Sequence, residues 1–173
     1  KIIFHKKNLG KGAAIQTAKK FISGDIVLIQ DADLEYDPQD YTKLIKPIIN
    51  GDAQVVYGSR VLGKKRYFVK NFSSIYRIFF NHVLTIFSNV LNKQELTDAH
   101  TCYKVFSTKL FNSIELRENG FSFCPEITTK ISKKNIPIIE IPIMYHGRSY
   151  KEGKKIKVSD GFEAIITILK YKF

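Results

Sequence analysis

The sequence is poor in the residues that mark several common classes of protein. It has two cysteines, Cys102 and Cys124, whose spacing matches neither a zinc site nor a redox pair. Its four histidines also lack metal-ligand spacing. The chain contains neither the Gly-x-Ser-x-Gly elbow of serine hydrolases nor a P-loop. These absences exclude a disulfide framework and favour two idle thiols in a reducing compartment.

We expect neither a secretory leader nor a membrane-spanning run within these 173 residues. Residue 1 is lysine and the only methionine is Met144, so we expect a fragment or a processed product. No positively charged start leads into an apolar core, which argues against a secretory signal. The long stretch 70–91 is interrupted by polar residues such as Arg77 and Asn81, so it does not predict a span. Its apolar stripe indicates a helix that packs in the core or lies on a membrane surface.

Charge is strongly one-sided, with 28 lysines and arginines against 16 aspartates and glutamates and a formal net charge of +12. Such a balance favours anionic partners, among them nucleic acids, anionic lipid head groups and phosphorylated substrates, without choosing between them. Hydrophobic residues make up 44% of the chain, which is typical of a folded domain rather than a disordered one. The length of 173 residues predicts one domain over 1–173.

The order of apolar runs and turn residues predicts an α/β fold with a mostly parallel sheet and flanking helices. The run at 25–30 is apolar on both faces, as in a strand covered by helices. Asp37, Pro38 and Asp40 carry the signals of a helix start. Proline within 136–145 favours an edge strand there. We expect strands at 1–4, 25–30, 53–57, 101–106 and 136–145, and helices at 13–22, 38–49, 70–91, 125–132 and 160–171.

Three acidic residues, Asp31, Asp33 and Glu35, directly follow the buried strand at 25–30. In an open parallel sheet, ligands collect at the carboxyl ends of the strands. Residues two apart in extended backbone point to the same side. Clustered carboxylates repel one another unless a cation joins them, and their hard oxygen atoms suit Mg²⁺ or Mn²⁺. Such a cation could stabilise a diphosphate leaving group; a polar turn with solvated acids is the alternative interpretation.

Gly58-Ser59-Arg60 follows the next predicted strand, where Arg60 could bind a phosphate through its planar guanidinium. A run of cations interleaved with aromatic residues comes next, made of Lys64, Lys65, Arg66, Tyr67, Phe68 and Lys70. This composition suits an anionic, partly apolar surface, single-stranded nucleic acid, or a solvated basic loop. Both features favour an anionic ligand near this strand.

Weaker signals lie in three other segments. Asn8-Leu9-Gly10-Lys11-Gly12 precedes a helix and is superficially similar to a phosphate-binding turn, but it has neither P-loop nor dinucleotide-binding spacing. Asp98 precedes a predicted strand and could be a base, a binding group or a turn residue. The glycine-punctuated, cationic segment 146–155 is consistent with a mobile flap over an anion or with an exposed basic loop.

Taken in order, these motifs resemble family 2 glycosyltransferases, in particular the dolichol-phosphate mannosyltransferase-like enzymes that use polyprenyl phosphates. The series is Asn-x-Gly-x-Gly at 8–12, Asp-Ala-Asp-Leu-Glu at 31–35, Gly-Ser-Arg at 58–60, Thr-Asp-Ala-His-Thr-Cys-Tyr-Lys-Val-Phe at 97–106, Gly-Arg-Ser-Tyr-Lys-Glu-Gly-Lys-Lys at 147–155, and Asp160-Gly161-Phe162. The resemblance covers nearly the whole chain and implies a GT-A fold, with a Rossmann-like sheet that binds a nucleotide sugar. Family members begin with strand–helix units that hold the nucleotide base, and we expect the first of these to be missing here.

The resemblance also implies roles for individual residues. Asp31 and Asp33 would bind a Mg²⁺ or Mn²⁺ ion and the donor diphosphate, with Glu35 as a third metal ligand. Asp98 falls where the family has an active-site acid, although Thr101-Cys102-Tyr103 replaces the usual Ser-Gly-Phe. The donor site would further include Asn8, Gly10, Lys11, Gly12, Arg148 and Lys154, and the acceptor-phosphate site would include Arg60, Lys70 and Ser74.

The implied reaction is a single displacement that inverts the sugar carbon and moves the sugar from a GDP- or UDP-sugar to a polyprenyl or dolichyl phosphate. An acceptor monophosphate is already anionic at neutral pH, since its second pKa is about 6, so it needs no general base. A sugar or protein hydroxyl would need one, with Asp98 as the candidate. That hydroxyl-directed reaction stays open, as does a noncatalytic basic module that binds nucleic acid or membrane. The ordered acids argue against the second.

The expected partners are therefore a nucleotide-sugar donor and a lipid-linked phosphate rather than nucleic acid, and the sequence indicates no oligomeric state. Membrane contact would be peripheral, through residues 64–91 or 160–173. We expect the chain on the cytoplasmic, inner face of a membrane.

Overall fold

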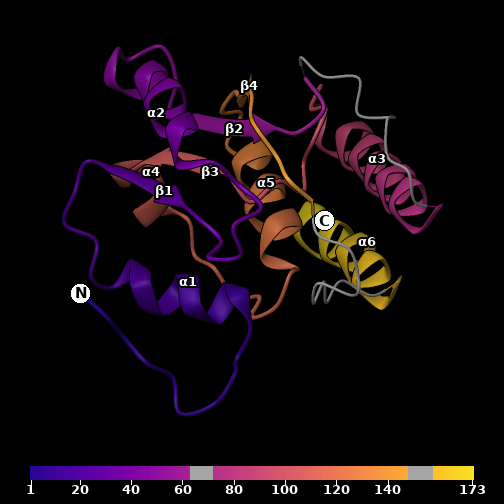
Figure 1. The fold of residues 1–173 in the computed structure, drawn as a ribbon, viewed down its shortest axis with the longest axis horizontal. Helices are drawn as coiled ribbons and strands as arrows, with labels where there is room; N and C mark the ends of the chain where they lie inside the picture. The colour runs from indigo at the N-terminus through magenta and orange to yellow at the C-terminus, as the bar shows by residue number, and fades with distance from the viewer. Residues whose placement is uncertain (63–71, 148–157) are drawn as a thin grey trace.

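The computed structural model describes residues 1–62, 72–147 and 158–173. Figure 1 shows a small open sheet surrounded by helices. The elements are α1 (Lys11–Lys19), β1 (Ile26–Ile29), a 3₁₀ turn (Pro38–Asp40), α2 (Tyr41–Ile49), β2 (Val55–Ser59), α3 (Phe72–Asn92), β3 (Lys104–Ser107), α4 (Thr108–Ser113), α5 (Phe123–Lys133), β4 (Ile139–Pro142) and α6 (Val158–Lys172). The predicted α/β class is confirmed.

The described sheet has the strand order β1-β3-β2-β4. β3 pairs antiparallel with both β1 and β2, whereas β4 pairs parallel with β2. Three strands therefore run in one direction, as expected, and β3 runs against them, which departs from the predicted parallel order. The irregular segment 93–103 carries the chain from α3 to the carboxyl edge before β3 begins, so β3 enters the sheet from that side.

Most predicted helices and strands form near their expected positions, and local chemistry explains the boundaries. Asp37 caps the turn before α2, accepting a hydrogen bond from the backbone N–H of Gln39 at 2.9 Å, and Pro38 occupies the first turn. β4 is an edge strand, as its prolines predicted. The short helix α4 was not predicted. Its cap is Ser107, which accepts from the N–H of Leu110.

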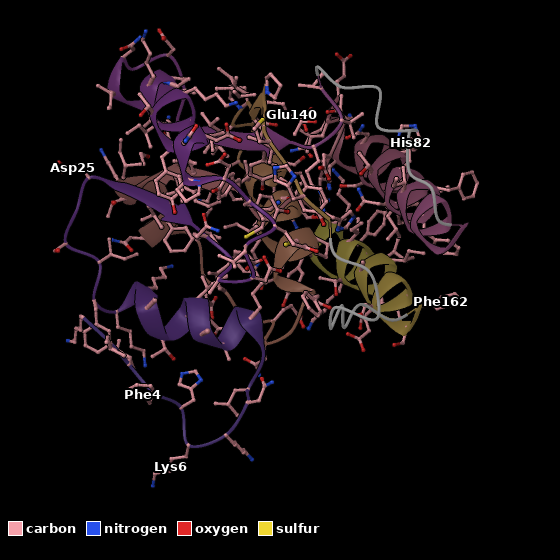
Figure 2. All side chains as sticks on the ribbon, viewed as in Figure 1. Phe4, Lys6, Asp25, His82, Glu140 and Phe162 are labelled. Carbon is pink, nitrogen blue, oxygen red and sulfur yellow. The ribbon has the colours of Figure 1, made fainter. Side chains whose placement is uncertain are left out.

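The predicted strand at 1–4 does not form. Ile2 and Phe4 are 81% and 88% exposed, and Figure 2 shows Phe4 on an extended segment away from the sheet. An apolar run becomes a strand only where a neighbouring backbone offers hydrogen bonds and a surface to pack on. No other described segment pairs with these residues.

The core lies on the sheet and supports its carboxyl edge. β2 is buried along its whole length, with Tyr57 packed edge-on against Phe106 of β3. Each large apolar side chain buried here contributes about 1.5–3 kcal/mol to stability. α2 packs against the strands, and α3, α5 and α6 pack against one another, as Figure 1 shows. None of the helices in the described residues combines the length and apolar character needed to cross a membrane.

Candidate active site

Strand direction brings three predicted site residues, Asp31, Arg60 and Asp98, to one edge of the sheet together with Tyr145, which was not predicted. Asp31 follows β1, Arg60 follows β2 and Tyr145 follows β4, and these three strands run the same way. Asp98 precedes β3, which runs in the opposite direction, so it reaches the same edge. In a fully parallel sheet, a residue before a strand would lie at the far edge. The antiparallel β3 is therefore what places Asp98 beside Arg60.

Asp31 is paired with a cation from the start of α1. The Nζ atom of Lys11 lies 2.7 Å from Oδ1 of Asp31 and 2.9 Å from Oδ2. Both side chains are partly buried, at 16% and 31% exposure, so solvent screens this pair less than a surface pair. The family resemblance implied that both residues belong to the donor site but did not predict their contact.

The backbone of the Asp-x-Asp segment does not stay extended as far as Glu35. Leu34 has φ of 61°, a left-handed conformation that turns the chain and breaks the alternation. Oδ1 of Asp33 accepts a hydrogen bond from the N–H of Glu35 at 3.2 Å. The Glu35 carboxylate instead accepts from the Tyr145 hydroxyl at 2.9 Å. In the described residues, no three acidic, histidine or cysteine side chains form a group that could hold a metal.

Asp31 and Asp33 nevertheless fit a divalent cation of one particular kind. Mg²⁺ is commonly held by one or two carboxylates together with the phosphate oxygens of a substrate, rather than by a cage made only of protein. Two carboxylates on one turn are such a donor set. Both oxygens of Asp31 face the Lys11 ammonium, so a divalent cation bound here would share this carboxylate with Lys11. The site therefore suits a cation that arrives with, or is completed by, a diphosphate.

Each residue of Gly58-Ser59-Arg60 has a separate role in the structure. A Cβ at Gly58 would lie 2.8 Å from Cγ2 of Ile143, closer than packed carbon atoms approach. The Ser59 hydroxyl accepts from two backbone N–H groups of the turn that follows, each at 3.1 Å. It also lies 2.7 Å from the hydroxyl of Thr97. These contacts fix the end of β2 and the backbone from which the Arg60 side chain extends.

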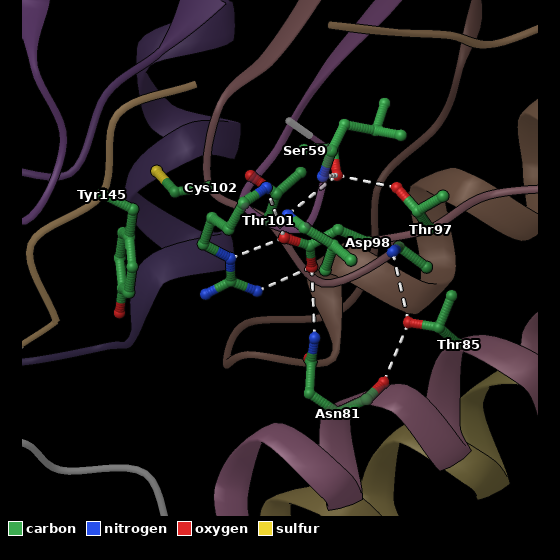
Figure 3. Close-up of polar contacts among 12 residues, drawn as sticks. Ser59, Asn81, Thr85, Thr97, Asp98, Thr101, Cys102 and Tyr145 are labelled. Carbon is green, nitrogen blue, oxygen red and sulfur yellow. Dashed lines mark hydrogen bonds and ion pairs between the residues drawn. The ribbon is translucent and has the colours of Figure 1, made fainter. Parts of the chain in front are cut away.

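Arg60 and Asp98 form a buried, two-pronged ion pair, drawn in Figure 3. Nε of Arg60 donates to Oδ2 of Asp98 at 2.6 Å and Nη2 donates to Oδ1 at 2.7 Å. The Asp98 carboxylate is fully buried, and the Arg60 side chain is 11% exposed. Burial disfavours the charge of Arg60, but the adjacent carboxylate outweighs it and raises the pKa of the guanidinium well above its ordinary value. The Tyr145 ring lies 5.1 Å from the guanidinium carbon.

Further polar residues hold Asp98 in place, and sequence reasoning missed them as members of the site. The Asn81 amide of α3 donates to Oδ1 of Asp98 at 3.2 Å. Glu140 of β4 accepts from the backbone N–H groups of Thr97 at 2.6 Å and Asp98 at 2.9 Å. It also accepts from the Thr97 hydroxyl at 2.8 Å. A single glutamate in a predicted edge strand does not indicate that it binds the backbone before another strand. That contact depends on how β4 pairs with β2.

The two glycines at the start of α1, Gly10 and Gly12, allow close packing against the loop 118–120. A Cβ at Gly12 would overlap the carbonyl oxygen of Glu118, and one at Gly10 would overlap that of Asn119. The backbone N–H of Gly12 donates to the Gly120 carbonyl at 3.3 Å, and that of Ala13 donates to Asn119 at 3.0 Å. Asn8 accepts from the N–H of Gly10 at 2.9 Å. These backbone amides thus bind carbonyl groups of the chain itself, while Lys11 is the residue of this motif that reaches Asp31.

Buried titratable groups lie behind the site. Burial lowers the pKa of His100 to about 4, and the nearby charge of Lys104 acts in the same direction. Burial also raises the pKa of the Cys102 thiol to about 12, so that thiol stays neutral. Lys104 is fully buried and donates to the carbonyls of Ala99 at 2.9 Å and Thr101 at 2.7 Å. The two bonds of Lys104 fix the turn between Asp98 and β3.

Four predicted site residues cannot be compared with this geometry. Lys70, Arg148 and Lys154 lie outside the described residues, together with the rest of the basic stretch before α3 and most of the segment 146–155. Ser74 lies in α3, and its side chain is likewise outside the description. Their roles remain predictions.

Comparison with known proteins identifies the relatives of this arrangement. Residues 1–115 match the family model described as glycosyl transferase family 2. A low-salt glycan biosynthesis hexosyltransferase, Agl6, of Haloferax volcanii is 30% identical over 147 residues, which cover 85% of this chain and 35% of that protein. The UDP-N-acetylglucosamine–dolichyl-phosphate N-acetylglucosaminyltransferase of Methanococcus voltae is 29% identical over 175 residues, which cover 98% of this chain and 68% of that protein.

The fold also matches a solved structure of glucosyl-3-phosphoglycerate synthase from Mycobacterium tuberculosis, in complex with Mn²⁺, UDP-glucose and phosphoglyceric acid. The TM-score is 0.63 at 17% sequence identity, and the match covers 94% of this chain and 55% of that one. At this identity the likeness concerns the fold alone, and it confirms the predicted GT-A architecture. The chain thus spans about a third of the first relative and about half of this structure.

Proposed function

The chain belongs to glycosyl transferase family 2, and we propose that it transfers a sugar from a nucleotide-sugar donor to the phosphate group of a polyprenyl phosphate. The observation that carries the proposal is the buried pair of Arg60 and Asp98 at the same sheet edge as Asp31. It supplies an oriented guanidinium for an anionic acceptor. A relative 29% identical over nearly the whole chain is named for transfer to dolichyl phosphate, which supports the same acceptor class.

Arg60 is suited to hold an acceptor phosphate. Asp98 binds the Nε and Nη2 groups, so the other side of the planar fork, with Nη1, is the part that can face a ligand. A guanidinium held in one orientation loses less rotational freedom when it binds an oxyanion than a mobile side chain does. Lys70 and Ser74 are proposed to complete this acceptor site.

The geometry favours a phosphate over a hydroxyl as the nucleophile. Both oxygens of Asp98 already accept hydrogen bonds from Arg60, and one also accepts from Asn81. A carboxylate held in this way is a structural partner for a cation rather than a base placed to remove a proton. A phosphate monoester with a second pKa of about 6 is already charged and needs no base. Catalysis would then rest on alignment and on charge stabilisation.

The donor diphosphate is proposed to lie at Asp31 and Asp33. Mg²⁺ or Mn²⁺ held there would stabilise the leaving nucleoside diphosphate as a Lewis acid. Lys11 orients the Asp31 carboxylate and adds a positive charge beside the diphosphate. Arg148 and Lys154 are proposed to contact the same diphosphate from the segment after β4. The fold relative that holds Mn²⁺ and UDP-glucose supports a donor of this kind.

An apolar face formed by α3 and α6 is proposed to rest on the lipid surface that carries the acceptor. Exposed apolar residues occur on both helices with similar spacing, on α3 at Phe79, Val83, Ile86 and Val90 and on α6 at Phe162, Ile166 and Leu169, with Phe173 directly after α6. Figure 2 shows Phe162 on the outer side of α6, and α3 and α6 pack together. Lys170 and Lys172 add cations to the last turn of α6, and cationic sequence precedes each helix. An apolar stripe bordered by cations suits the interface of an anionic bilayer, which we place on the cytoplasmic side.

The test is acceptor discrimination by the full natural polypeptide and by the 173-residue chain. Each is given a panel of GDP- and UDP-sugars, Mg²⁺ or Mn²⁺, and either a short polyprenyl phosphate, the matching polyprenol, or a soluble glycoside. We expect product only from the polyprenyl phosphate. Equal or better transfer to the polyprenol or the glycoside would overturn the phosphate acceptor and return Asp98 to consideration as a base.

A further inference from the structure

We propose that Glu140 is a positioning residue of the acceptor site, which sets the orientation of Arg60 through the backbone of Thr97 and Asp98. The inference rests on the proposed function for the identity of the acceptor. Glu140 lies in β4, outside every motif that pointed to the site in the sequence. It touches neither Arg60 nor the expected position of either substrate in the described contacts.

The first step is the contact between Glu140 and the segment before β3. Oε2 accepts from the N–H and the hydroxyl of Thr97, and Oε1 accepts from the N–H of Asp98. All three distances are between 2.6 and 2.9 Å, as in charge-assisted hydrogen bonds. Residues 97 and 98 belong to no helix or strand, so these N–H groups have no ladder to satisfy them. The Glu140 carboxylate accepts the hydrogen bonds that a neighbouring strand would otherwise accept from these N–H groups.

The second step leads from Asp98 to Arg60. Once its backbone is fixed, Asp98 directs Oδ1 and Oδ2 at Nη2 and Nε of the guanidinium. Oδ2 also accepts from the backbone N–H of Arg60 at 3.1 Å. A shift of the 97–98 backbone would therefore change the plane of the fork that meets the acceptor phosphate. Tilting a planar, two-pronged donor weakens both of its hydrogen bonds at once.

A third contact shows why β4 can serve as a fixed reference. Glu140 is in register with Tyr57 of β2, and Arg60 leaves the sheet from the end of that same strand. Ser59 is the last residue of β2 and directly precedes Arg60, and its hydroxyl lies 2.7 Å from the hydroxyl of Thr97. Arg60, which would bind the acceptor phosphate, and Glu140, which supports it, are thus both anchored to the paired strands β2 and β4. Outer partners of metal ligands change affinity or activity by about 10–100-fold when they are removed, and we expect an effect of the same order from this support of an anion-binding arginine.

The test compares Glu140→Gln with Glu115→Gln. The first variant keeps the size of the side chain but turns an amide N–H₂ toward backbone N–H donors. The second removes the same charge from an exposed carboxylate that pairs only with Arg117 in the described contacts. We expect Glu140→Gln to raise the KM for a short polyprenyl phosphate by about 10–100-fold while the donor KM stays within twofold. Glu115→Gln should change neither value. Glu140→Asp, which keeps the carboxylate, should lie between Gln and the natural protein.

A double-mutant cycle shows whether Glu140 acts through Asp98. If it does, adding Glu140→Gln to Asp98→Asn produces no further rise in acceptor KM, because the link is already broken. Independent effects that multiply would overturn the proposal. So would a uniform loss of kcat with both KM values unchanged.

A measurement without substrate separates this proposal from the proposed function. In protein labelled with ¹⁵N-arginine, the Nε–H of Arg60 should exchange slowly with solvent, because it is buried and bound to Asp98. Glu140→Gln should accelerate that exchange about tenfold or more, and Glu115→Gln should not. Unchanged exchange would overturn the positioning role whatever the acceptor is. If Glu140→Gln accelerates the exchange but the natural protein transfers no sugar to polyprenyl phosphate, the positioning role stands and the proposed function is refuted.

Discussion

Replacement of Arg60 by lysine tests whether the two-pronged geometry, rather than charge alone, serves the acceptor. Lysine keeps the positive charge but has one nitrogen, which cannot occupy the Nε and Nη2 positions together. The pair at 2.6 and 2.7 Å from the two oxygens of Asp98 would become a single contact. The ammonium would also lose the rigid plane that we assign to the acceptor phosphate.

The magnitude follows from the loss of one charge-assisted hydrogen bond on each side of Arg60. Such a bond is worth about 1.5–3 kcal/mol. On the Asp98 side, the free energy of unfolding should fall by about that amount, because the carboxylate is fully buried. On the acceptor side, the same loss corresponds to a fall of about 10–150-fold in kcat/KM for polyprenyl phosphate. The KM for the nucleotide sugar should not change, since Arg60 is not assigned to the donor.

The assay measures initial rates over a range of polyprenyl phosphate concentrations at saturating donor, with urea unfolding in parallel. Arg117→Lys is the matched control, because Arg117 makes the same two-pronged contact with Glu115, at 3.0 Å for both bonds, on the surface. It should leave the kinetic constants unchanged. An Arg60→Lys protein with kcat/KM for the acceptor within twofold of the natural protein would refute the reasoning, as would a rise confined to the donor KM.

Three further perturbations test other parts of the structure. Gly12→Ala should lower the free energy of unfolding by about 1–3 kcal/mol in urea titrations, because its new Cβ overlaps the facing loop; Gly120→Ala, with open space around it, should leave the urea midpoint nearly unchanged. Burial depresses the pKa of His100 from 6.5 to about 4, so the unfolded state binds the extra proton and the thermal midpoint should fall as pH drops from 6.5 toward 4; His100→Gln should flatten that dependence, and an equally steep profile would contradict it. Ile86→Glu on the apolar face of α3 should weaken sedimentation with anionic vesicles at least tenfold. Ile49→Glu, at an apolar site on α2 that is also exposed, should not, and equal losses would remove the membrane assignment.

The elements that follow local chemistry could be predicted from the sequence. The helix that begins near Pro38 was predicted from a cap and a proline in the first turn, and both act as expected. The strands at 26–29 and 55–59 were predicted from apolar runs between turn residues. The run at 1–4 has the same composition and forms no strand, because strand formation also depends on a neighbour that composition does not reveal.

The direction of β3 is the feature that the sequence could not supply. Apolar runs at 101–106 indicate a strand but contain no signal of whether it runs with or against its neighbours. That direction decides whether Asp98 meets Arg60, so the sequence suggested both residues through family resemblance without their pairing. The contribution of Glu140 depends on the register between β2 and β4 and was invisible for the same reason.

The Asp-x-Asp segment shows how a local rule can fail at a site. Alternation in extended backbone predicted Asp31 and Asp33 on one side with Glu35 nearby, and the left-handed conformation of Leu34 turns the chain before Glu35. Leucine rarely adopts positive φ, so nothing in the sequence predicted a turn at this residue. Asp31 and Asp33 keep the predicted position after β1, while Glu35 contacts Tyr145.

The most direct test of the central claim is to identify both products of one reaction by mass spectrometry. The full natural polypeptide is incubated with a short polyprenyl phosphate, a panel of nucleotide sugars and Mn²⁺, with and without a chelator, beside an Asp31→Asn variant. The account predicts a glycosyl polyprenyl monophosphate and an equal amount of nucleoside diphosphate, both lost with the chelator and strongly reduced by Asp31→Asn. Release of nucleoside monophosphate with a lipid diphosphate product, or no glycosylated lipid from any donor, would contradict it.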